Sequence, residues 1–227
     1  MNSYSLTKFA LIASAGVALA GCNVASGGGG GGGTAAGGAV TSGNYAANLK
    51  AVQDLIPTSD MPTSLKATYN GASRMDLRET NGGAIVGEVL ADLELTADWT
   101  DGQAGNPWSG KADNFRGTLN KNDFAIAGDL TVAKAEAKSL TSAIGRTSNT
   151  INLPTGGSTT VSTGSTMIQL SGEVDNDGTP TTVLMSLGGG FFGSGGQAIS
   201  GPASLQGFRS GGIRSDLIAA GDFYATQ

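Results

Sequence analysis

The sequence has no histidine and only one cysteine, Cys22. These absences exclude Ser–His–Asp and Cys–His catalysis, nearly all zinc and copper sites, and any disulfide bond within the chain. Charged residues make up only 14% of the chain, and the 13 basic side chains form no cluster that would hold a nucleic-acid backbone. Glycine occurs 38 times, and Ser, Thr and Asn recur between short apolar runs, which favours strands and turns over helices.

Residues 1–21 have the organisation of a secretory leader. A polar start containing Lys8 precedes the apolar run Phe9–Ala20, which is too short to span a bilayer. The adjoining residues Leu-Ala-Gly-Cys resemble the bacterial lipobox, whose cysteine is acylated before the signal peptide is removed. We therefore expect a lipoprotein signal peptide over 1–21 and a lipid, including palmitate, on Cys22. The alternative is an ordinary secretory leader with an unmodified cysteine. The residue after the cysteine is Asn23 and not aspartate, and in the lipoproteins that this segment resembles, such a residue favours export to the outer membrane.

Residues 22–43 are expected to form a flexible tether, because they include seven consecutive glycines, Gly27–Gly33. Such a run cannot offset its backbone entropy by burying side chains. As a coil of about 21 residues, Asn23–Gly43 would reach roughly 25 Å. A phosphate-binding loop is excluded, because no strand pattern precedes the glycines and no Lys-Ser/Thr follows them. The folded part is therefore expected to stand clear of the lipid headgroups.

A short helix with its connector is predicted over 44–62. Apolar residues recur at helical spacing within Asn44–Ile56, at Tyr45, Leu49, Val52 and Ile56. Ser42 or Asn44 is the expected cap, and Pro57 ends the run. We expect the apolar face of this helix to pack against the barrel predicted below, or to close one of its ends.

From Leu65 onwards the hydrophobic period changes to two, which is the spacing of half-buried strands. The pattern is clearest in Glu88–Trp99, whose apolar face consists of Val89, Ala91, Leu93, Leu95, Ala97 and Trp99. About eight to ten short strands follow one another at regular spacing over 63–227. They predict a mainly β fold, a single antiparallel up-and-down barrel of about eight strands.

Three stretches within this region are harder to interpret. Asn70-Gly71 is typical of a turn or a bulge. Thr141–Ser165 is rich in Ser, Thr and Gly and is interpreted as a long loop or a ragged hairpin. Ala133–Leu140 fits either a helical turn or a strand extension.

Five blocks carry a pattern beyond the strand period: Ala67–Gly71, Ala91–Trp99, Trp108–Phe115, Gly188–Gly201 and Gly221–Gln227. In this order they resemble the transferrin-binding-protein-like surface lipoproteins of bacteria. Phe191, Phe192, Gly193 and Gly201 match a C-terminal signature of that family, while Ser194 stands where the family usually has proline. The resemblance implies an eight-stranded barrel that binds host proteins, haem or other nutrients, sometimes after delivery by a dedicated translocator. The chain has no room for the family's handle domain, so neither transferrin binding nor any ligand-binding residue is carried over.

Aromatic side chains are the candidate ligand contacts, in particular Trp108 and Phe192. Trp99 and Trp108 flank a loop, and an exposed tryptophan buries a large area on binding at modest entropic cost. A place in the barrel core is the alternative for both and is favoured for Trp99. Phe191 and Phe192 must face opposite sides of an extended strand, so one ring is either covered by the predicted helix or available to a partner.

Two acidic patterns suggest other chemistry. The carboxylates on one strand face have a spacing that general acid–base catalysis or glycoside hydrolysis allows, although solvated surface residues are the favoured interpretation. They are Glu88, Asp92, Glu94 and Asp98. Asp175, Asp177 and Gly178 resemble part of a calcium loop, but Ser186 stands where an acidic ligand would close it. A plain hairpin turn is therefore favoured there.

The expected function is that of a non-enzymatic binding module on an outer-membrane, cell-surface lipoprotein without a cofactor or metal. Its expected partners are the membrane through the lipid anchor, the lipoprotein processing and sorting machinery, an outer-membrane translocator, and a protein or nutrient ligand. A periplasm-facing structural lipoprotein of the envelope is the first alternative. A carboxylate-dependent hydrolase is the second.

Overall fold

The computed structural model describes the part of the chain that follows most of the predicted tether. The described residues are 41–79, 82–133, 141–154, 156–176, 179–209 and 212–227. The predicted signal peptide, Cys22 and the glycine run lie outside them, as does nearly all of Ala133–Leu140.

The described residues form ten strands, one α-helix and one short 3-10 helix. The helices are α1 (Ser42–Gln53) and η1 (Ser194–Gly196). The strands are β1 (Ser64–Arg78), β2 (Ile85–Thr100), β3 (Trp108–Leu119), β4 (Asn122–Gly128), β5 (Leu130–Val132), β6 (Ala143–Asn152), β7 (Ser158–Asn176), β8 (Thr179–Phe192), β9 (Ala198–Arg209) and β10 (Gly212–Thr226).

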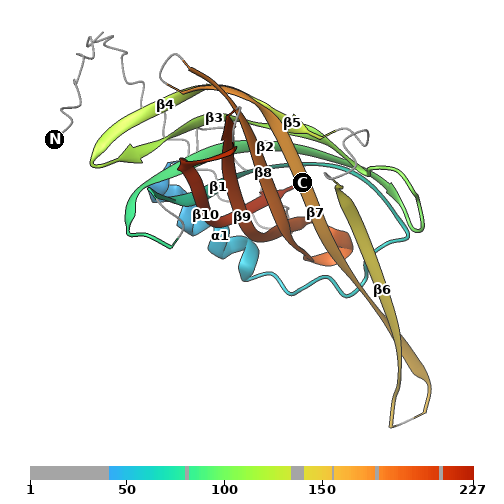
Figure 1. Cartoon of the computed structure of the whole chain (residues 1–227). Helices are drawn as coiled ribbons and strands as arrows, with labels where there is room; N and C mark the ends of the chain where they lie inside the picture. Colours follow the sequence, from blue (N-terminus) through green and yellow to red (C-terminus); the bar gives the residue numbers. More distant parts are fainter. Residues whose placement is uncertain (1–40, 80–81, 134–140, 155, 177–178, 210–211) are drawn as a thin grey trace, which may run out of the picture. The chain divides into compact units, whose positions relative to one another are not determined.

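The strands close into a ring (Figure 1). Neighbours pair antiparallel in the order β2-β1-β10-β9-β8-β7-β4-β3, and β3 pairs again with β2. β4 and β5 follow one another between β3 and β7, so the ring has eight strand positions. Among the described strands, β6 lies off the ring and pairs with β7 alone. The predicted eight-stranded antiparallel barrel is confirmed.

Apolar side chains fill the barrel interior, because alternate residues of each strand point inward. The six residues predicted for the inner face of β2, from Val89 to Trp99, are all at most 4% exposed. At one end, the ring of Tyr69 packs against those of Trp108 and Phe191, with centroids 5.9 and 6.4 Å apart. Each large side chain buried in this way stabilises the fold by roughly 1.5–3 kcal/mol. The barrel is therefore a packed core.

Helix α1 lies on the outside of the barrel, against β1, β9 and β10 (Figure 1). Tyr45 and Val52 are buried there in a second apolar cluster, which includes Tyr224. The hydroxyl of Tyr45 donates a hydrogen bond to the Asp222 carbonyl at 2.6 Å. The first of the two predicted placements, packing of the helix against the barrel, is the one observed.

The ends of α1 differ from the prediction. Thr41 caps the helix, because its side chain accepts from the Asn44 amide while the Asn44 side chain accepts from the Thr41 amide. The helix ends at Gln53, and Ile56 is 82% exposed. The prediction that Ile56 belongs to the packed face is therefore wrong, since the chain has left the helix before it.

Asn70-Gly71 is neither a turn nor a bulge, which corrects the sequence prediction. Strand β1 runs through it in continuous register with β2 and β10. A Cβ atom on Gly71 would collide with the Tyr224 carbonyl and Ala225 of β10. The glycine therefore permits the close approach of two strands and does not serve a turn.

β6 and the first half of β7 form a hairpin that projects from the barrel (Figure 1). Ala143–Asn152 pairs with Ser158–Met167 in unbroken register, and Ser165–Asn176 continues into the barrel beside β8. We call residues 143–167 the arm. Of the two interpretations of Thr141–Ser165, the hairpin is correct and the long loop is wrong, because its many β-branched threonines favour extended backbone.

The segment 54–63, which we call the strap, closes the barrel end from which the arm projects. The Thr58 amide donates to the Phe191 carbonyl at 3.0 Å, and the Met61 amide donates to the Ser162 carbonyl at 2.9 Å. The side chain of Met61 is 2% exposed and joins the barrel core. The strap therefore ties β8 to the base of the arm.

Candidate functional site

The two tryptophans lie in the barrel core. Trp99 and Trp108 are each 4% exposed, and within the described residues the indole nitrogen of Trp108 has no hydrogen-bond partner. A ring that is packed against Tyr69 inside the barrel is not presented to a ligand. Of the two interpretations of Trp108, the structure therefore favours the place in the barrel core.

Phe191 and Phe192 face opposite sides of β8, as predicted. Phe191 is 2% exposed and lies inside the barrel, whereas Phe192 is partly buried against the cluster beneath α1. Of the two expectations for the outward ring, cover by the helix is the one that the structure favours. Phe192 therefore packs α1 onto the barrel and offers little free surface to a partner.

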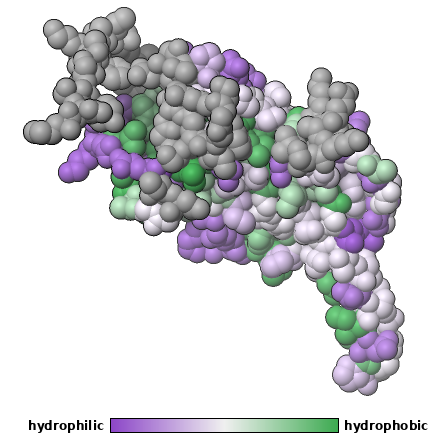
Figure 2. Space-filling view, viewed as in Figure 1, coloured by the Kyte–Doolittle hydropathy of each residue, from purple (hydrophilic) through white to green (hydrophobic). Residues whose placement is uncertain are grey.

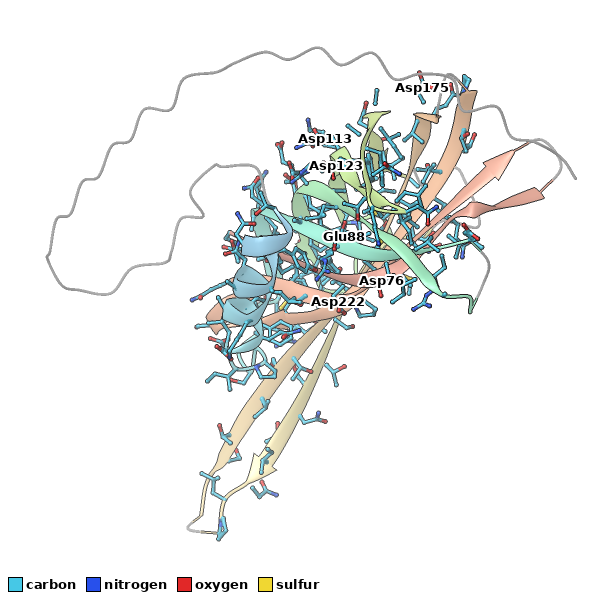
Figure 3. The ribbon with its side chains drawn as sticks, turned by 90° about the vertical axis from the view of Figure 1, so that its left-hand side faces the viewer. Asp76, Glu88, Asp113, Asp123, Asp175 and Asp222 are labelled. Carbon is cyan, nitrogen blue, oxygen red and sulfur yellow. The ribbon has the colours of Figure 1, made fainter. Side chains whose placement is uncertain are left out.

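The acidic face of β2 lies on the outer wall of the barrel, where Figure 3 labels Glu88. Three of its carboxylates form ion pairs with neighbouring strands: Glu88 with Arg74 at 2.6 Å, Asp92 with Arg116 at 2.8 Å, and Asp98 with Lys66 at 3.5 Å. Glu94 lies opposite Lys111 in the β2–β3 register. Cross-strand ion pairs of this kind contribute up to about 1 kcal/mol each. They account for this face as part of the sheet's surface.

Asp175, the described member of the aspartate pair, lies near the end of β7 and pairs with Pro180 of β8, which agrees with the favoured hairpin. Asp175 lies at the barrel end opposite the arm (Figure 3). Ser186, at the position that would close a calcium loop, lies within β8 and pairs with Gln169. Asp177 and Gly178 lie outside the described residues. In the part of the chain that is described, no three His, Cys, Asp or Glu side chains group as a metal site.

The arm is the most exposed element of the domain (Figure 2, lower right). From Thr147 to Thr160, every described residue is exposed. Three of the six large apolar side chains exposed among the described residues belong to the arm: Ile151 at 50%, Leu153 at 43% and Met167 at 50%. An isolated two-stranded ribbon is marginally stable in water. Exposed apolar side chains on such a ribbon therefore mark the arm as a candidate interaction surface.

The two faces of the arm differ. The odd-numbered residues of β6, together with their β7 partners, form a face without any charged side chain, which includes Ile151 and Met167. On the even-numbered face, hydroxyls pair across the strands: Ser148 with Ser162 at 2.7 Å and Thr150 with Thr160 at 3.3 Å. We call the odd-numbered side the outer face of the arm.

Arg146 anchors the base of the arm to the strap. Its guanidinium donates to the Met61 carbonyl at 2.9 Å and to the Ser162 hydroxyl at 2.8 Å, and it lies 3.4 Å from the carboxylate of Asp101. Only 19% of its side chain is exposed. A guanidinium that holds three partners from separate segments fixes the direction in which the arm leaves the barrel.

The strap is itself held by a carboxylate. Asp60 accepts hydrogen bonds from the Ser194 hydroxyl at 2.6 Å and from the Gly195 amide at 2.8 Å. These two hydrogen bonds hold the pKa of the Asp60 carboxyl below its usual value, and the bond from Ser194 has the larger effect. Inside the same barrel end, the Tyr69 hydroxyl donates to the Gly196 carbonyl at 2.7 Å, and burial raises the pKa of Tyr69 to about 12.

The order of residues in the arm indicates a hairpin, although the overall composition of this segment favours a loop. No charged residue occurs between Thr147 and Gly172, and five of the nine residues of Ser158–Thr166 are β-branched. A run of β-branched residues on both sides of Leu-Pro-Thr-Gly-Gly is a hairpin pattern. The abundance of Ser and Gly favours a loop when it is weighed alone.

Comparison of this chain with protein-family models, with curated proteins and with solved structures finds no match. The resemblance to transferrin-binding-protein-like lipoproteins therefore stays a prediction from the quoted blocks. Of the helices in the described residues, none is both long and apolar enough to cross a membrane. The predicted lipidation of Cys22 concerns a residue outside the described part.

Proposed function

We propose that this chain is a lipid-anchored outer-membrane protein whose barrel domain is a non-enzymatic binding module at the cell surface. The leader, Cys22 and the glycine tether support the anchor. The observation that carries the binding role is the arm, an exposed hairpin without charged residues from Thr147 to Met167, on a barrel whose interior is filled. A ligand is therefore bound outside the barrel, and a protein or other large ligand fits such a surface better than a small molecule.

The outer face of the arm is the proposed contact surface. Its aliphatic groups, Ile151 and Leu153, sit among uncharged Thr and Asn side chains near the tip. Such a surface selects a partner by apolar contact and hydrogen bonding, with little electrostatic steering. Binding through it is expected to depend weakly on ionic strength.

Protease shaving of intact cells tests the location. Cells express the full chain with a C-terminal epitope, and a known periplasmic protein is the control. Loss of the epitope while the control survives supports the surface location. Protection of the epitope until the outer membrane is breached contradicts it and favours the periplasm-facing structural lipoprotein.

A matched pair of double variants tests the contact surface. Host proteins, haem and polysaccharides are screened against cells carrying the unsubstituted chain. Ile151→Thr/Leu153→Thr should then lose at least about tenfold in affinity, since roughly 1.4 kcal/mol of apolar contact disappears. Ile85→Thr/Leu119→Thr is the control, because these side chains are similarly exposed, at 54% and 42%, on other strands. Equal loss in both variants would refute a specific role of the arm.

Cys22→Ala tests the anchor. The variant should remain an unprocessed precursor and should not incorporate labelled palmitate, because the acylated thiol is absent. Continued labelling would show that the lipid is carried elsewhere and would refute the assignment of Cys22.

A further inference from the structure

We propose that the free edge of β6 pairs with the β6 edge of a second copy of this chain, so that two arms form one four-stranded antiparallel sheet. This inference concerns the edge of the arm and goes beyond the ligand-binding role of its outer face.

The direction of the backbone groups in β6 follows from the strap. The Ser162 amide donates to the Ser59 carbonyl, and the Ser162 carbonyl accepts from the Met61 amide, so both groups point away from β6. In an antiparallel pair, residues directly opposite one another either exchange both hydrogen bonds or direct both groups outward, in alternation. Ser148 lies opposite Ser162 and therefore directs its backbone groups away from β7.

The same alternation applies along the whole of β6. Arg146 and Thr150 share the orientation of Ser148, because they lie two residues away on either side. The turn agrees, since the Leu153 amide donates to the Gly157 carbonyl and so places odd-numbered residues in the hydrogen-bonded set. Among the described strands only β7 pairs with β6. The outward groups of Arg146, Ser148 and Thr150 thus form an edge that a further strand can join.

This edge lacks the usual protection against strand pairing. Edge strands are commonly guarded by exposed lysine, inward charge, proline or a bulge. Here Arg146 is the one charged residue of β6, and it is engaged by the strap and Asp101. The β6–β7 ladder has no bulge from Ala143 to Asn152. The arm therefore presents a regular edge whose one charged residue, Arg146, is paired with Asp101.

A second copy is the occupant that fits this edge. The chain carries a net charge of −5, which disfavours contact between two copies in general. Along the edge of the arm the one charged residue, Arg146, is paired with Asp101, so two edges meet there without opposed free charges. Because the Arg146 charge is already paired, the edge also offers little charge complementarity to a charged partner strand. If the proposed lipid anchor holds, copies on one membrane additionally meet at a high effective concentration.

The register is self-complementary about Ser148. With a twofold axis at this residue, Ser148 faces its own mate, and Arg146 faces Thr150 of the second copy, so like charges are not opposed. The three pairs form about six hydrogen bonds. On the outer face, Ile151 then lies beside Gly145 of the second copy, and Leu153 lies beside its Ala143, which neighbours Met167. The exposed apolar groups of the two arms are brought together, and the outer face stays open for a ligand.

Cysteine cross-linking on intact cells tests the pairing with the full chain. Opposed residues in a hydrogen-bonded pair have Cα atoms about 5.5 Å apart, which lies within disulfide reach. Ser148→Cys is therefore expected to give a disulfide-linked dimer upon oxidation with copper–phenanthroline. Thr160→Cys is the control, since it is equally exposed, but its mate lies three strand spacings away, more than about 14 Å. The unsubstituted chain, whose only cysteine is Cys22, provides the baseline.

A proline variant distinguishes cross-linking through paired strands from cross-linking through random encounters of two copies. Thr150→Pro removes one outward amide while leaving the ladder with β7 intact, because Thr150 does not donate to β7. In the Ser148→Cys background it should abolish the dimer without changing the melting temperature by more than a few degrees. Absence of a dimer with Ser148→Cys overturns the proposal, as does equal cross-linking of Ser148→Cys and Thr160→Cys. A product whose mass is that of this chain joined to a different protein also overturns it, in favour of a heterologous partner strand. Loss or retention of ligand binding does not affect these outcomes.

Discussion

Replacing Tyr69 by phenylalanine should reverse its effect on stability between neutral and alkaline pH. The Tyr69 hydroxyl donates to the Gly196 carbonyl at 2.7 Å and accepts from the Gln227 side-chain amide at 3.0 Å. Without the hydroxyl, Gln227 still donates to Gly196 at 3.0 Å, so no buried group loses its last partner. Tyr69→Phe should therefore lower the free energy of unfolding by only about 1 kcal/mol at pH 8.

The expected loss of stability at alkaline pH follows from the raised pKa of Tyr69. The pKa of Tyr69 is about 12 in the fold, above the ordinary value of 10.0, because burial disfavours the phenolate. The unfolded chain then loses its proton first, so stability falls as pH rises from 10 towards 12. This linkage removes about 1.4 kcal/mol by pH 11 and about 2.3 kcal/mol by pH 12. The two chains should be equally stable near pH 11, and the phenylalanine variant should be the more stable one above it.

Urea unfolding of both proteins at pH 8, 10, 11 and 11.5 checks the reversal. The other tyrosines with raised pKa values, Tyr45 and Tyr224, are present in both chains and cancel in the difference. A stability difference that does not change with pH would refute the burial of a neutral Tyr69 in the barrel. A variant that is more stable at pH 8 would refute the contribution of its hydrogen bonds.

Three further perturbations test the core, the strap and the arm. Phe223→Ala should lower the free energy of unfolding by about 3–5 kcal/mol in urea titrations, since Phe223 is fully buried, whereas Ile151→Ala should change it by less than about 0.5 kcal/mol. Asp60→Asn should lower the melting temperature at pH 7 but not in acid, because a carboxylate with a lowered pKa stabilises the fold above its unfolded pKa and loses this effect as pH falls through its folded value. Arg146→Ala should speed limited proteolysis of the arm while leaving the barrel intact, because the guanidinium ties the arm to the strap. Unchanged cleavage in the last variant would show that strand pairing alone fixes the arm.

The barrel could be predicted because its strands alternate strictly. In β2, every second residue from Val89 to Trp99 is apolar and buried inside the barrel. Leu90 breaks the rule by being buried on the outer side, at 3% exposed, since α1 covers that wall. A pattern along one strand cannot report what a distant helix covers. Counting such segments gave eight to ten strands, and closure followed from the need to remove sheet edges. The number eight was implied by the family resemblance.

Where the sequence pattern misled, as at Gly71, or left two interpretations open, as at Trp108, a tertiary contact decides the conformation. Gly71 belongs in a strand because β10 passes too close for a side chain. Trp108 is in the core because β3 begins at this residue and turns it inward beside Tyr69. Neither contact is local in sequence. The favoured assignment of Trp99 to the core succeeded because this residue ends an unbroken alternation, whereas Trp108 begins its strand directly after a loop.

The arm is the place where local structure and global fold disagree most. A ribbon that is exposed on both faces buries too little to offset the entropy of ordering about 14 residues between Thr147 and Thr160, at roughly 1–2 kcal/mol each for the backbone. Arg146 and the strap secure only its base. The remaining stabilisation has to come from cross-strand threonine pairs, which contribute about 0.2–1 kcal/mol each, or from contacts that form when a partner is present. Pairing of two arms along β6 supplies the missing hydrogen bonds, which is why the edge of the arm and its outer face are expected to act together.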